Sequence, residues 1–181
     1  MRTDTDLAEA FRNGDDRAYS ILYDRYKCAL YAFSLKMLGE ADTASDIVQD
    51  VFLRIYERRN QLNRPESFRG WLFAIARNRC LSQLRRERGH TSLEEAPDEA
   101  IAVAAPVDSR ESEEDVWLIR RALARLRFEY REVLVLREYQ DLSYREIAEI
   151  TETSESAVKS KLFKARKALH EMLKPAFAGR R

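Results

Sequence analysis

The sequence is poor in glycine, proline, cysteine and histidine. Only 5 of its 181 residues are glycine and 4 are proline, too few for a β-sandwich or barrel, which needs turn residues every few positions. The two cysteines, Cys28 and Cys80, lie 52 positions apart and form neither a CxxC motif nor a disulfide framework. No apolar run approaches the roughly 18 residues that span a bilayer. These shortages favour a reduced, helical protein that does not insert into a membrane.

Signatures of catalysis are also missing. Neither His90 nor His170 lies beside a cysteine or acidic cluster with metal-ligand spacing, and there is no glycine-rich phosphate loop and no G-x-S-x-G motif. Without local histidine partners, Cys28 and Cys80 are predicted to be small buried hydrophobic side chains. We therefore expect no enzymatic activity, no metal, no cofactor and no small-molecule substrate. The first residues carry no apolar segment, so no secretory signal is expected and a cytoplasmic protein is predicted.

Charge is plentiful and unevenly distributed. The formal net charge is only +1, yet residues 69–88 hold six arginines and one acid, and residues 154–181 hold eight bases and two acids. Between these blocks, residues 89–115 hold nine acids and one base. Two basic blocks around an acidic bridge indicate binding to a polyanion, although two solvated helix faces and a disordered linker would give the same pattern.

The acidic stretch also divides the chain into two modules. Residues 89–114 include Pro97 and Pro106, many acids and no aromatic residue, so they cannot bury enough area to offset the entropy of ordering. Residues 1–88 and 115–181 on either side carry helical periodicity. The predicted fold is all-α, with two small helical domains joined by a flexible acidic linker.

The first module is predicted to contain three helices, over residues 16–38, 43–59 and 67–86, because apolar residues recur there at helical spacing. Gly39 is expected to end the first of them, since glycine adopts the left-handed conformation that follows a helix C-terminus. Ser67 is a candidate N-cap for the third.

The second module is predicted to hold four helices, over about residues 116–126, 129–138, 143–151 and 154–173. Trp117, Ile119 and Leu123 are expected in the core of the first. Ser143 and Glu146 have the S-x-x-E spacing of a capping box at the start of the third helix. A short capped helix, a tight turn and a longer basic helix are the layout of a helix-turn-helix.

The last helix is predicted to have two different faces. One apolar stripe repeats at i, i+4, i+7 and i+11 and consists of Val158, Leu162, Ala165 and Leu169. The opposite face carries serines, lysines and one aromatic residue: Ser156, Lys159, Ser160, Phe163, Lys164 and Lys167. Serine and lysine side chains can hydrogen-bond phosphates and base edges in a major groove. The alternative is a solvated cationic face.

Two patterns in the first module also allow a functional and a structural interpretation. Residues 68–79 alternate arginines with aromatic residues, which suits stacking on single-stranded nucleic acid, although Trp71 is more commonly a core residue. Asn78, between two arginines, could read a base edge. On the preceding helix, a polar face opposite the apolar stripe could dock a basic partner helix or could simply be solvated; it comprises Asp46, Gln49, Asp50 and Leu53.

Four segments of the sequence are similar to those of a known family. They read ASDIVQDVFL (44–53), FRGWLFAIARN (68–78), LSYREIA (142–148) and SAVKSKLFKAR (156–166). In this order, around such a linker, they resemble the extracytoplasmic-function class of bacterial sigma factors, the promoter-recognition subunits of RNA polymerase. The resemblance covers about residues 16–88 and 117–173, and its motifs are specific in combination. It implies that residues 1–88 are sigma region 2 and residues 115–181 are region 4.

The resemblance also implies roles for the residues above. Region 2 docks on the clamp helices of the beta-prime subunit through the face of Asp46, Gln49, Asp50 and Leu53. It also opens the minus-ten element and holds a flipped base, and Asn78 matches the position that helps to read that base. We assign four arginines of the same helix to the minus-ten DNA as well: Arg77, Arg79, Arg85 and Arg86. Region 4 reads the minus-thirty-five element as duplex and binds the beta flap tip; Lys159, Ser160 and Lys164 match DNA-contacting positions.

The partners implied are therefore RNA polymerase core, promoter DNA and an anti-sigma factor that sequesters both domains. The free protein is expected to bind promoter DNA poorly, because polymerase joins two weak sites through effective concentration. The runner-up is a stand-alone helix-turn-helix repressor or activator that binds as a dimer. It would explain the second module but leaves the arginine block and the acidic bridge without a role.

Overall fold

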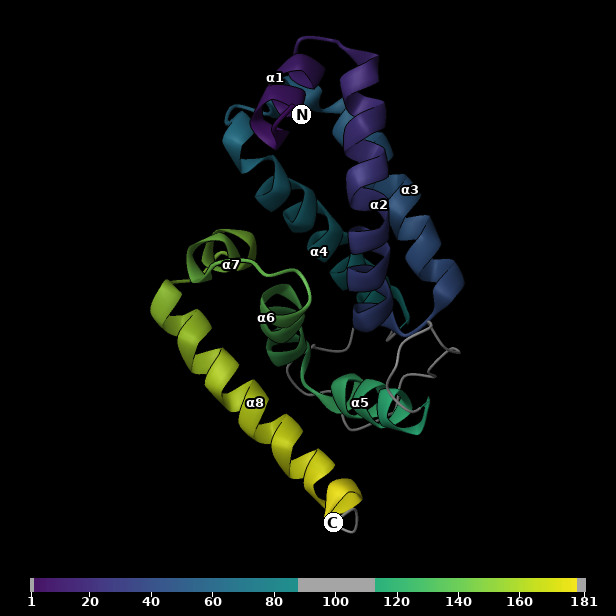
Figure 1. Ribbon diagram of the computed structural model, residues 1–181, viewed down its shortest axis with the longest axis vertical. Helices are drawn as coiled ribbons and strands as arrows, with labels where there is room; N and C mark the ends of the chain where they lie inside the picture. Colours follow the sequence, from purple (N-terminus) through teal and green to yellow (C-terminus); the bar gives the residue numbers. More distant parts are fainter. Residues whose placement is uncertain (1, 88–112, 179–181) are drawn as a thin grey trace.

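The computed structural model describes residues 2–87 and 113–178 (Figure 1). Within them the chain forms only helices and turns, with no β-strand: α1 (Asp4–Arg12), α2 (Asp16–Leu38), α3 (Ala41–Glu57), η1 (Arg59–Gln61), η2 (Pro65–Ser67), α4 (Phe68–Glu87), α5 (Glu113–Arg125), α6 (Phe128–Glu138), α7 (Tyr144–Thr151) and α8 (Glu155–Phe177). The all-α prediction is confirmed. The predictions for Pro97, Pro106 and His90 concern residues outside the described ranges.

Helices α1–α4 form the N-terminal module, in which α2 packs against α1, α3 and α4. The start of α2 is capped by Asp15, whose Oδ1 accepts hydrogen bonds from the amides of Arg17 and Ala18 at 2.9 and 3.2 Å. Its end is set by Gly39, which has the left-handed φ of 85°. The bounds of α2 therefore match the predicted helix and its predicted stop.

Helix α1 is absent from the sequence prediction, although the sequence carries its signal. Thr3 Oγ1 accepts from the Asp6 amide at 3.2 Å, and the Asp6 carboxylate accepts from the Thr3 amide at 2.9 Å. This is a capping box with Asp in the acidic position. Leu7 and Phe11, four residues apart, bury one side of the helix against the module. The helix is short, so only two large apolar residues mark its period.

Helices α5–α8 form the C-terminal module. Helix α8 packs against α5, α6 and α7 and runs along the outer edge of the molecule (Figure 1). Helix α6 lies in the interior, and all of residues 131–136 are buried. Because consecutive residues of a helix point in different directions, their burial requires other helices on all sides of α6. Here those neighbours are α8 and α7 from its own module and α2 from the N-terminal module.

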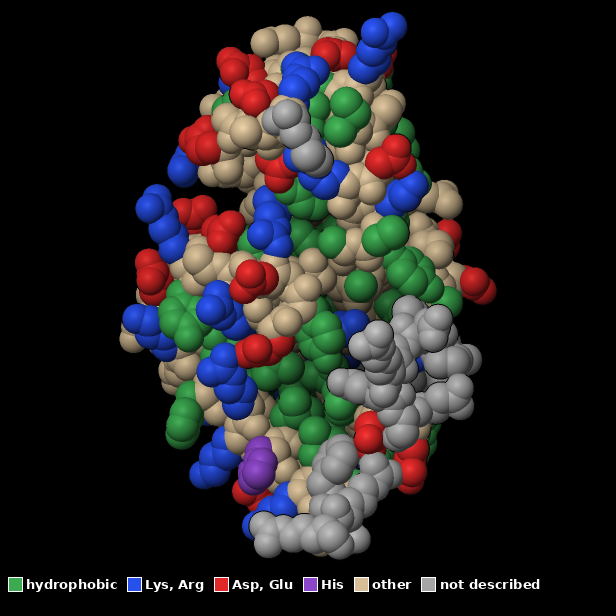
Figure 2. Space-filling view, in the orientation of Figure 1, with side chains coloured by type: hydrophobic (Ala, Val, Ile, Leu, Met, Phe, Trp, Pro, Cys, Tyr) green, Lys and Arg blue, Asp and Glu red, His purple; other side chains and the backbone are tan. Residues whose placement is uncertain are grey.

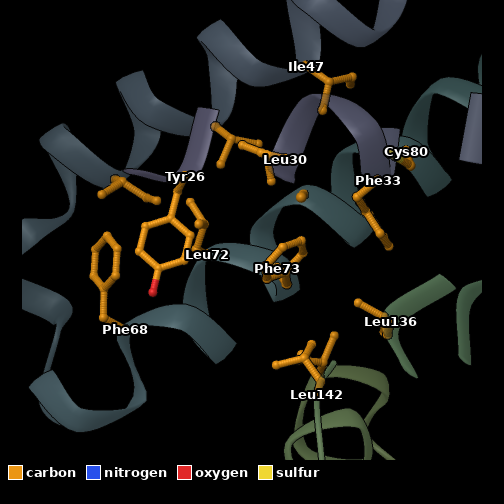
Figure 3. Packing of buried hydrophobic residues seen from close by; sticks show 14 of the residues in the cluster. Tyr26, Leu30, Phe33, Ile47, Phe68, Leu72, Phe73, Cys80, Leu136 and Leu142 are labelled. Carbon is orange, nitrogen blue, oxygen red and sulfur yellow. The ribbon is translucent and has the colours of Figure 1, made fainter. Parts of the chain in front are cut away.

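The two modules are packed directly against each other. Helix α2 contacts α5 and α6, and α4 contacts α7. One hydrophobic core runs through both modules: Phe33 and Phe73 come from the first, and Leu136 and Leu142 from the second (Figure 3). Because burial of apolar area is the dominant favourable term in folding, this continuity stabilises the two modules as a single body.

Two predictions about buried residues are wrong. Cys28 is exposed, because it lies two positions from Tyr26 and Leu30, which face the core, and so points the other way around α2. Trp117 is 47% exposed for the same reason. Ile119 and Leu123 face the core of the C-terminal module, and Trp117 lies on the opposite side of α5. The Arg121 guanidinium lies 5.1 Å from the centre of the Trp117 ring. Cys80 is buried as predicted, and burial raises the pKa of its thiol to about 12.

Candidate nucleic-acid interface

Helices α7 and α8 are joined as a helix-turn-helix. Ser143 and Glu146 form the predicted capping box: Ser143 Oγ accepts from the Glu146 amide at 3.2 Å, and Glu146 Oε2 accepts from the Ser143 amide at 2.8 Å. Three residues, 152–154, lead into α8, where Ser154 Oγ accepts from the Ala157 amide at 3.1 Å. The turn lacks glycine, and Glu152 adopts the left-handed conformation itself, with a φ of 54°. The two helices are thereby fixed at a short separation.

Helix α8 buries three of the four residues of the predicted stripe, leaves Leu169 half-buried, and exposes the predicted polar face. Val158, Leu162 and Ala165 are buried against the rest of the C-terminal module. All six residues of the opposite face are exposed, and we call this set the α8 outer face: Ser156, Lys159, Ser160, Phe163, Lys164 and Lys167. Phe163 is 71% exposed, an apolar side chain held in water between lysines. Figure 2 shows Lys and Arg side chains along this edge.

The residues predicted to contact the minus-ten DNA occupy different environments on α4. Asn78, Arg85 and Arg86 are exposed. Arg79 is half-buried and pairs with Asp50 of α3. Arg77 is 17% exposed and pairs with Glu132 of α6, with Nε 2.6 Å from Oε2. Only the first three are therefore open to a ligand in this arrangement.

The aromatic residues of α4 belong to the core. Phe73 is fully buried, and its ring centre lies 5.5 Å from that of Phe33 in an edge-on contact. Trp71 is half-buried and packs beside Phe68, with ring centres 6.4 Å apart. Phe73 is therefore a core residue, and Trp71 packs against the core without being fully buried.

The predicted docking face lies on the outside of α3. Asp46, Gln49 and Leu53 are exposed, Leu53 by 56%. Asp50 is half-buried and accepts from Arg54 Nε at 3.3 Å, while also contacting Arg79 of α4. Three of the four residues are thus available to a partner, and the fourth links α3 to α4.

Two family models match these regions of the chain. "Sigma-70 region 2" matches residues 22–90, and "Sigma-70, region 4" matches residues 117–169. The ECF RNA polymerase sigma factor SigW of Bacillus subtilis (strain 168) is 29% identical over 173 residues, covering 90% of this chain and 92% of the relative. The chain belongs to the extracytoplasmic-function class of sigma-70 factors. Its function is that of the class, to direct RNA polymerase to promoters.

Other relatives and solved structures agree with this assignment. The ECF RNA polymerase sigma-E factor of Escherichia coli (strain K12) is 28% identical over 183 residues, covering 96% of this sigma factor and 95% of the relative. The sigma factor RpoE in complex with the anti-sigma factor NepR, from Bartonella quintana, has a TM-score of 0.72 at 26% identity over 88% of this chain and 97% of that chain. CnrH in complex with the cytosolic domain of CnrY shares the fold, with a TM-score of 0.74 at 24% identity, over 95% of this chain and 97% of that one.

Four polar residues join the two modules of this sigma factor, and their role was not predicted from the sequence: Arg69, Arg131, Glu132 and Gln140. Arg131 and Glu132 are 3% and 1% exposed and Gln140 is 5% exposed. A charged pair of neighbours directly before the apolar run of α6, residues 133–136, was the available signal. Periodicity assigns such residues to a solvated face, because it cannot detect a partner that lies far away in the sequence.

A cavity of about 660 Å³ lies between α2, α3 and α5 of the sigma factor. Its walls include Tyr31, Leu35 and Val48, and Gln49 of the predicted docking face also lines it. Four cationic side chains lie around it, and no acidic residue does among the described lining residues: Lys27, Lys36, Arg120 and Arg131. Burial, and next the nearby charge of Arg120, lowers the pKa of Lys36. The cavity therefore combines apolar walls with cationic side chains, of which Lys27 also pairs with Asp24.

Among the described residues, no group of three or more histidine, cysteine and acidic side chains is arranged to hold a metal ion. Within the same ranges, no helix has the length and apolarity that crossing a membrane requires.

Proposed function

We propose that this sigma factor reads the minus-thirty-five element as duplex through the α8 outer face. The observation that carries the proposal is the exposure of all six of its residues on a capped helix whose other side is buried. Recognition helices place side chains near their N-termini against base edges in the major groove. Lys159 and Lys164 can donate to guanine acceptors or phosphates, and Ser156 and Ser160 to either.

In the same proposal, the N-terminal module opens and holds the minus-ten element through α4. Asn78 is exposed and carries an amide that can hydrogen-bond a base edge, while Arg85 and Arg86 can contact phosphates. Arg77 and Arg79 complete the set. Flipping a base costs a few kcal/mol in general, so the pocket contacts must offset lost pairing and stacking.

The α3 face is the proposed contact with polymerase, on the clamp helices of the beta-prime subunit. Asp46 and Gln49 supply acceptors for basic partner side chains, and Leu53 offers an exposed apolar contact beside them. The C-terminal module would bind the beta flap tip. Residues 1–88 then act as region 2 and residues 115–181 as region 4, with residues 89–114 as the linker.

An anti-sigma factor is the proposed regulator, acting in the bacterial cytoplasm where polymerase works. The cavity between α2, α3 and α5 supports this partner, because its apolar walls and the cationic side chains of Lys36 and Arg120 fit a regulator segment that carries apolar and carboxylate side chains. A segment seated there would cover Gln49 and contact both modules at once. One solved relative, the sigma factor RpoE, is named as a complex with the anti-sigma factor NepR.

Run-off transcription with purified core polymerase on a pool of randomised promoters tests the proposal. Transcripts that appear only when this protein is added support it, and the selected sequences give both elements. Replacing Asp46 and Asp50 together should then abolish core docking, while Lys159→Ala should relax selection at the upstream element alone. No transcripts, together with a shift of duplex DNA by a dimer of the free protein, would favour a helix-turn-helix repressor instead.

A further inference from the structure

Two cationic side chains from different helices lie over the ring of Tyr144, the first residue of α7. The Nζ atom of Lys159, on α8, lies 5.7 Å from the ring centre. The guanidinium carbon of Arg137, on α6, lies 5.2 Å from the same point. Both distances fall within the roughly 6 Å at which the face of an aromatic ring attracts a cation. Tyr144 therefore links α7 to both of its neighbours in the C-terminal module (Figure 1).

Tyr144 is held in place by its own surroundings. It directly follows Ser143, whose capping-box bonds with Glu146 fix the start of α7. Its ring is half-buried and packs against the core. Arg137 is fixed as well, because its Nη1 donates to the oxygen of Leu142 at 2.8 Å. A ring supported in this way can orient a flexible side chain that contacts it.

Lys159 is the flexible member of this group. Its side chain is exposed on the α8 outer face, and its long stem gives it many rotamers in water. DNA binding removes that freedom, so a contact that restricts the side chain beforehand lowers the entropic cost. An ammonium group has three N–H donors. The ring attracts the charge without using all of them, which leaves donors available for DNA.

The other two lysines of the α8 outer face differ from Lys159 in this respect. Among the described residues, Lys159 is the lysine of that face whose ammonium lies over an aromatic ring, while Lys164 and Lys167 have no such ring contact. A charge that rotates freely can contact any phosphate. Selection of a base requires a donor at a defined position, because sequence is read from base edges. The ring contact therefore favours a role in sequence reading for Lys159.

We propose that Tyr144 is a positioning residue for the minus-thirty-five element, and that its ring holds the Lys159 ammonium where it reads one base pair. The inference rests on the proposed function, which assigns Lys159 to that element. Lysine donates to the O6 and N7 atoms of guanine in the major groove, so a guanine is the expected base. Without the ring, the charge of Lys159 remains and still attracts phosphates, but it no longer favours one base.

The hydroxyl group of Tyr144 has a separate neighbour. The pKa of Arg166 on α8 is raised chiefly by its hydrogen bond with Glu138, and to a smaller degree by the Tyr144 oxygen. Tyr144→Phe removes the hydroxyl group and keeps the ring, whereas Tyr144→Leu removes both. The two variants together therefore distinguish the ring contact from the hydroxyl contact.

Binding of the holoenzyme to DNA tests the proposal. The probes are the promoter selected by run-off transcription and copies in which each base pair of its upstream element is replaced in turn. The base pair read by Lys159 is the one at which Lys159→Ala loses discrimination. There the wild type should favour the selected base pair by about fivefold or more. Tyr144→Leu should retain less than about half of that ratio, and Tyr144→Phe should stay within about twofold of the wild type.

The salt dependence of binding provides a second readout. Lys159→Ala removes a charge and should reduce the slope of log affinity against log salt concentration. Tyr144→Leu keeps that charge, so its slope should equal that of the wild type. Lower base discrimination at an unchanged slope is the result expected of a positioning residue. A slope reduced as far as in Lys159→Ala would contradict the proposal, because the lysine would then have lost its DNA contact altogether.

A double-mutant cycle shows whether Tyr144 acts through Lys159. Added to Lys159→Ala, Tyr144→Leu should change discrimination no further. The matched control is Tyr130→Leu, since Tyr130 is also half-buried, has the Arg127 guanidinium 5.7 Å from its ring centre and lies outside the α8 outer face. This control should keep the discrimination of the wild type. Circular dichroism shows whether each variant keeps its helices, and Tyr144→Met is a second variant without a ring should Tyr144→Leu unfold.

The outcomes separate this inference from the proposed function. If Lys159→Ala relaxes the upstream element while Tyr144→Leu discriminates as the wild type does, the positioning role is wrong and the proposed function stands. An equal loss in Tyr144→Leu with and without Lys159 also overturns the role, because Tyr144 would then act independently of the lysine. If Lys159→Ala itself leaves selection unchanged, the proposed reading of DNA by α8 fails, and this inference fails with it.

Discussion

The carboxylate of Asp50 on α3 contacts the guanidinium of Arg79 on α4 and also accepts from Arg54 within its own helix. A residue of the proposed polymerase-docking face is therefore held by a residue of the proposed minus-ten set. The proposed polymerase contact and the proposed DNA contact are therefore linked through the Asp50–Arg79 ion pair, because a movement of either side chain would break it. Asp46, on the same face, is exposed and has no ion pair among the described residues.

This difference predicts distinct effects of two equivalent substitutions. Asp46→Asn should weaken binding to core polymerase several-fold and leave thermal stability unchanged. Asp50→Asn should weaken binding and also lower the free energy of unfolding by about 1 kcal/mol, because it removes the charge that pairs with Arg54 and Arg79. Fluorescence anisotropy with core polymerase and thermal unfolding measure the two effects. Wild-type affinity in Asp46→Asn would contradict the proposed docking face.

The lysines of the α8 outer face should contribute to promoter binding in a salt-dependent way. Each phosphate contact adds about 0.9 to the slope of log affinity against log salt concentration. We therefore expect Lys159→Ala or Lys164→Ala to reduce that slope by up to about 1 in holoenzyme bound to its selected promoter. Lys174→Ala removes the same charge near the other end of α8, outside this face, and serves as the control. An equal loss in the control would mean that only overall charge matters.

The left-handed backbone at Glu152 predicts a stabilising substitution. A residue with a side chain at a φ of 54° is strained, whereas glycine adopts this conformation freely. Glu152→Gly should raise the free energy of unfolding by about 0.5–1 kcal/mol in urea titrations. Asp141→Gly is a useful comparison: its φ is 50°, but aspartate tolerates this region better, so the gain should be smaller. A lower free energy of unfolding in Glu152→Gly would show that the contacts of the Glu152 side chain stabilise the fold by more than the left-handed backbone destabilises it.

Glu132 should make stability depend on pH. Burial raises its pKa, and the hydrogen bond from Arg77 opposes this; Lys161 of α8 and Glu129 of α6 are the other charged groups nearby. A raised pKa in the folded state means that the contribution of Glu132 to stability is fully present below the pKa of an exposed glutamate, about 4.3. It is lost as pH rises through the raised value.

We therefore expect the unfolding free energy of the wild type, measured relative to Glu132→Gln, to increase as pH is lowered from neutral. Urea titrations at a series of pH values provide the comparison, and the glutamine variant supplies a neutral side chain of the same size. A difference that stays constant with pH would show that Glu132 titrates normally in the folded protein.

Local patterns in the sequence were enough to predict most of the helices and the α8 outer face. The end of the helix at Leu38 was predicted because Gly39 adopts the left-handed conformation that ends a helix. The Ser143–Glu146 capping box marks the start of its helix through contacts between residues three positions apart. Val158, Leu162 and Ala165 face the core because the helical period itself places them together. Such features depend on neighbours along the chain, which a sequence displays directly.

The tertiary structure alone decided how the modules meet and which functional residues are covered. Arg77 and Asn78 are neighbours in sequence, yet the first is paired with Glu132 and the second is exposed. Trp117 lies outside the core because α2 and α8 pack against a different face of α5. The partners of Arg77, Gln140 and Arg131 lie 55, 111 and 94 positions away. Periodicity extends over only a few turns of one helix, so contacts at such separations appear only once the chain has folded.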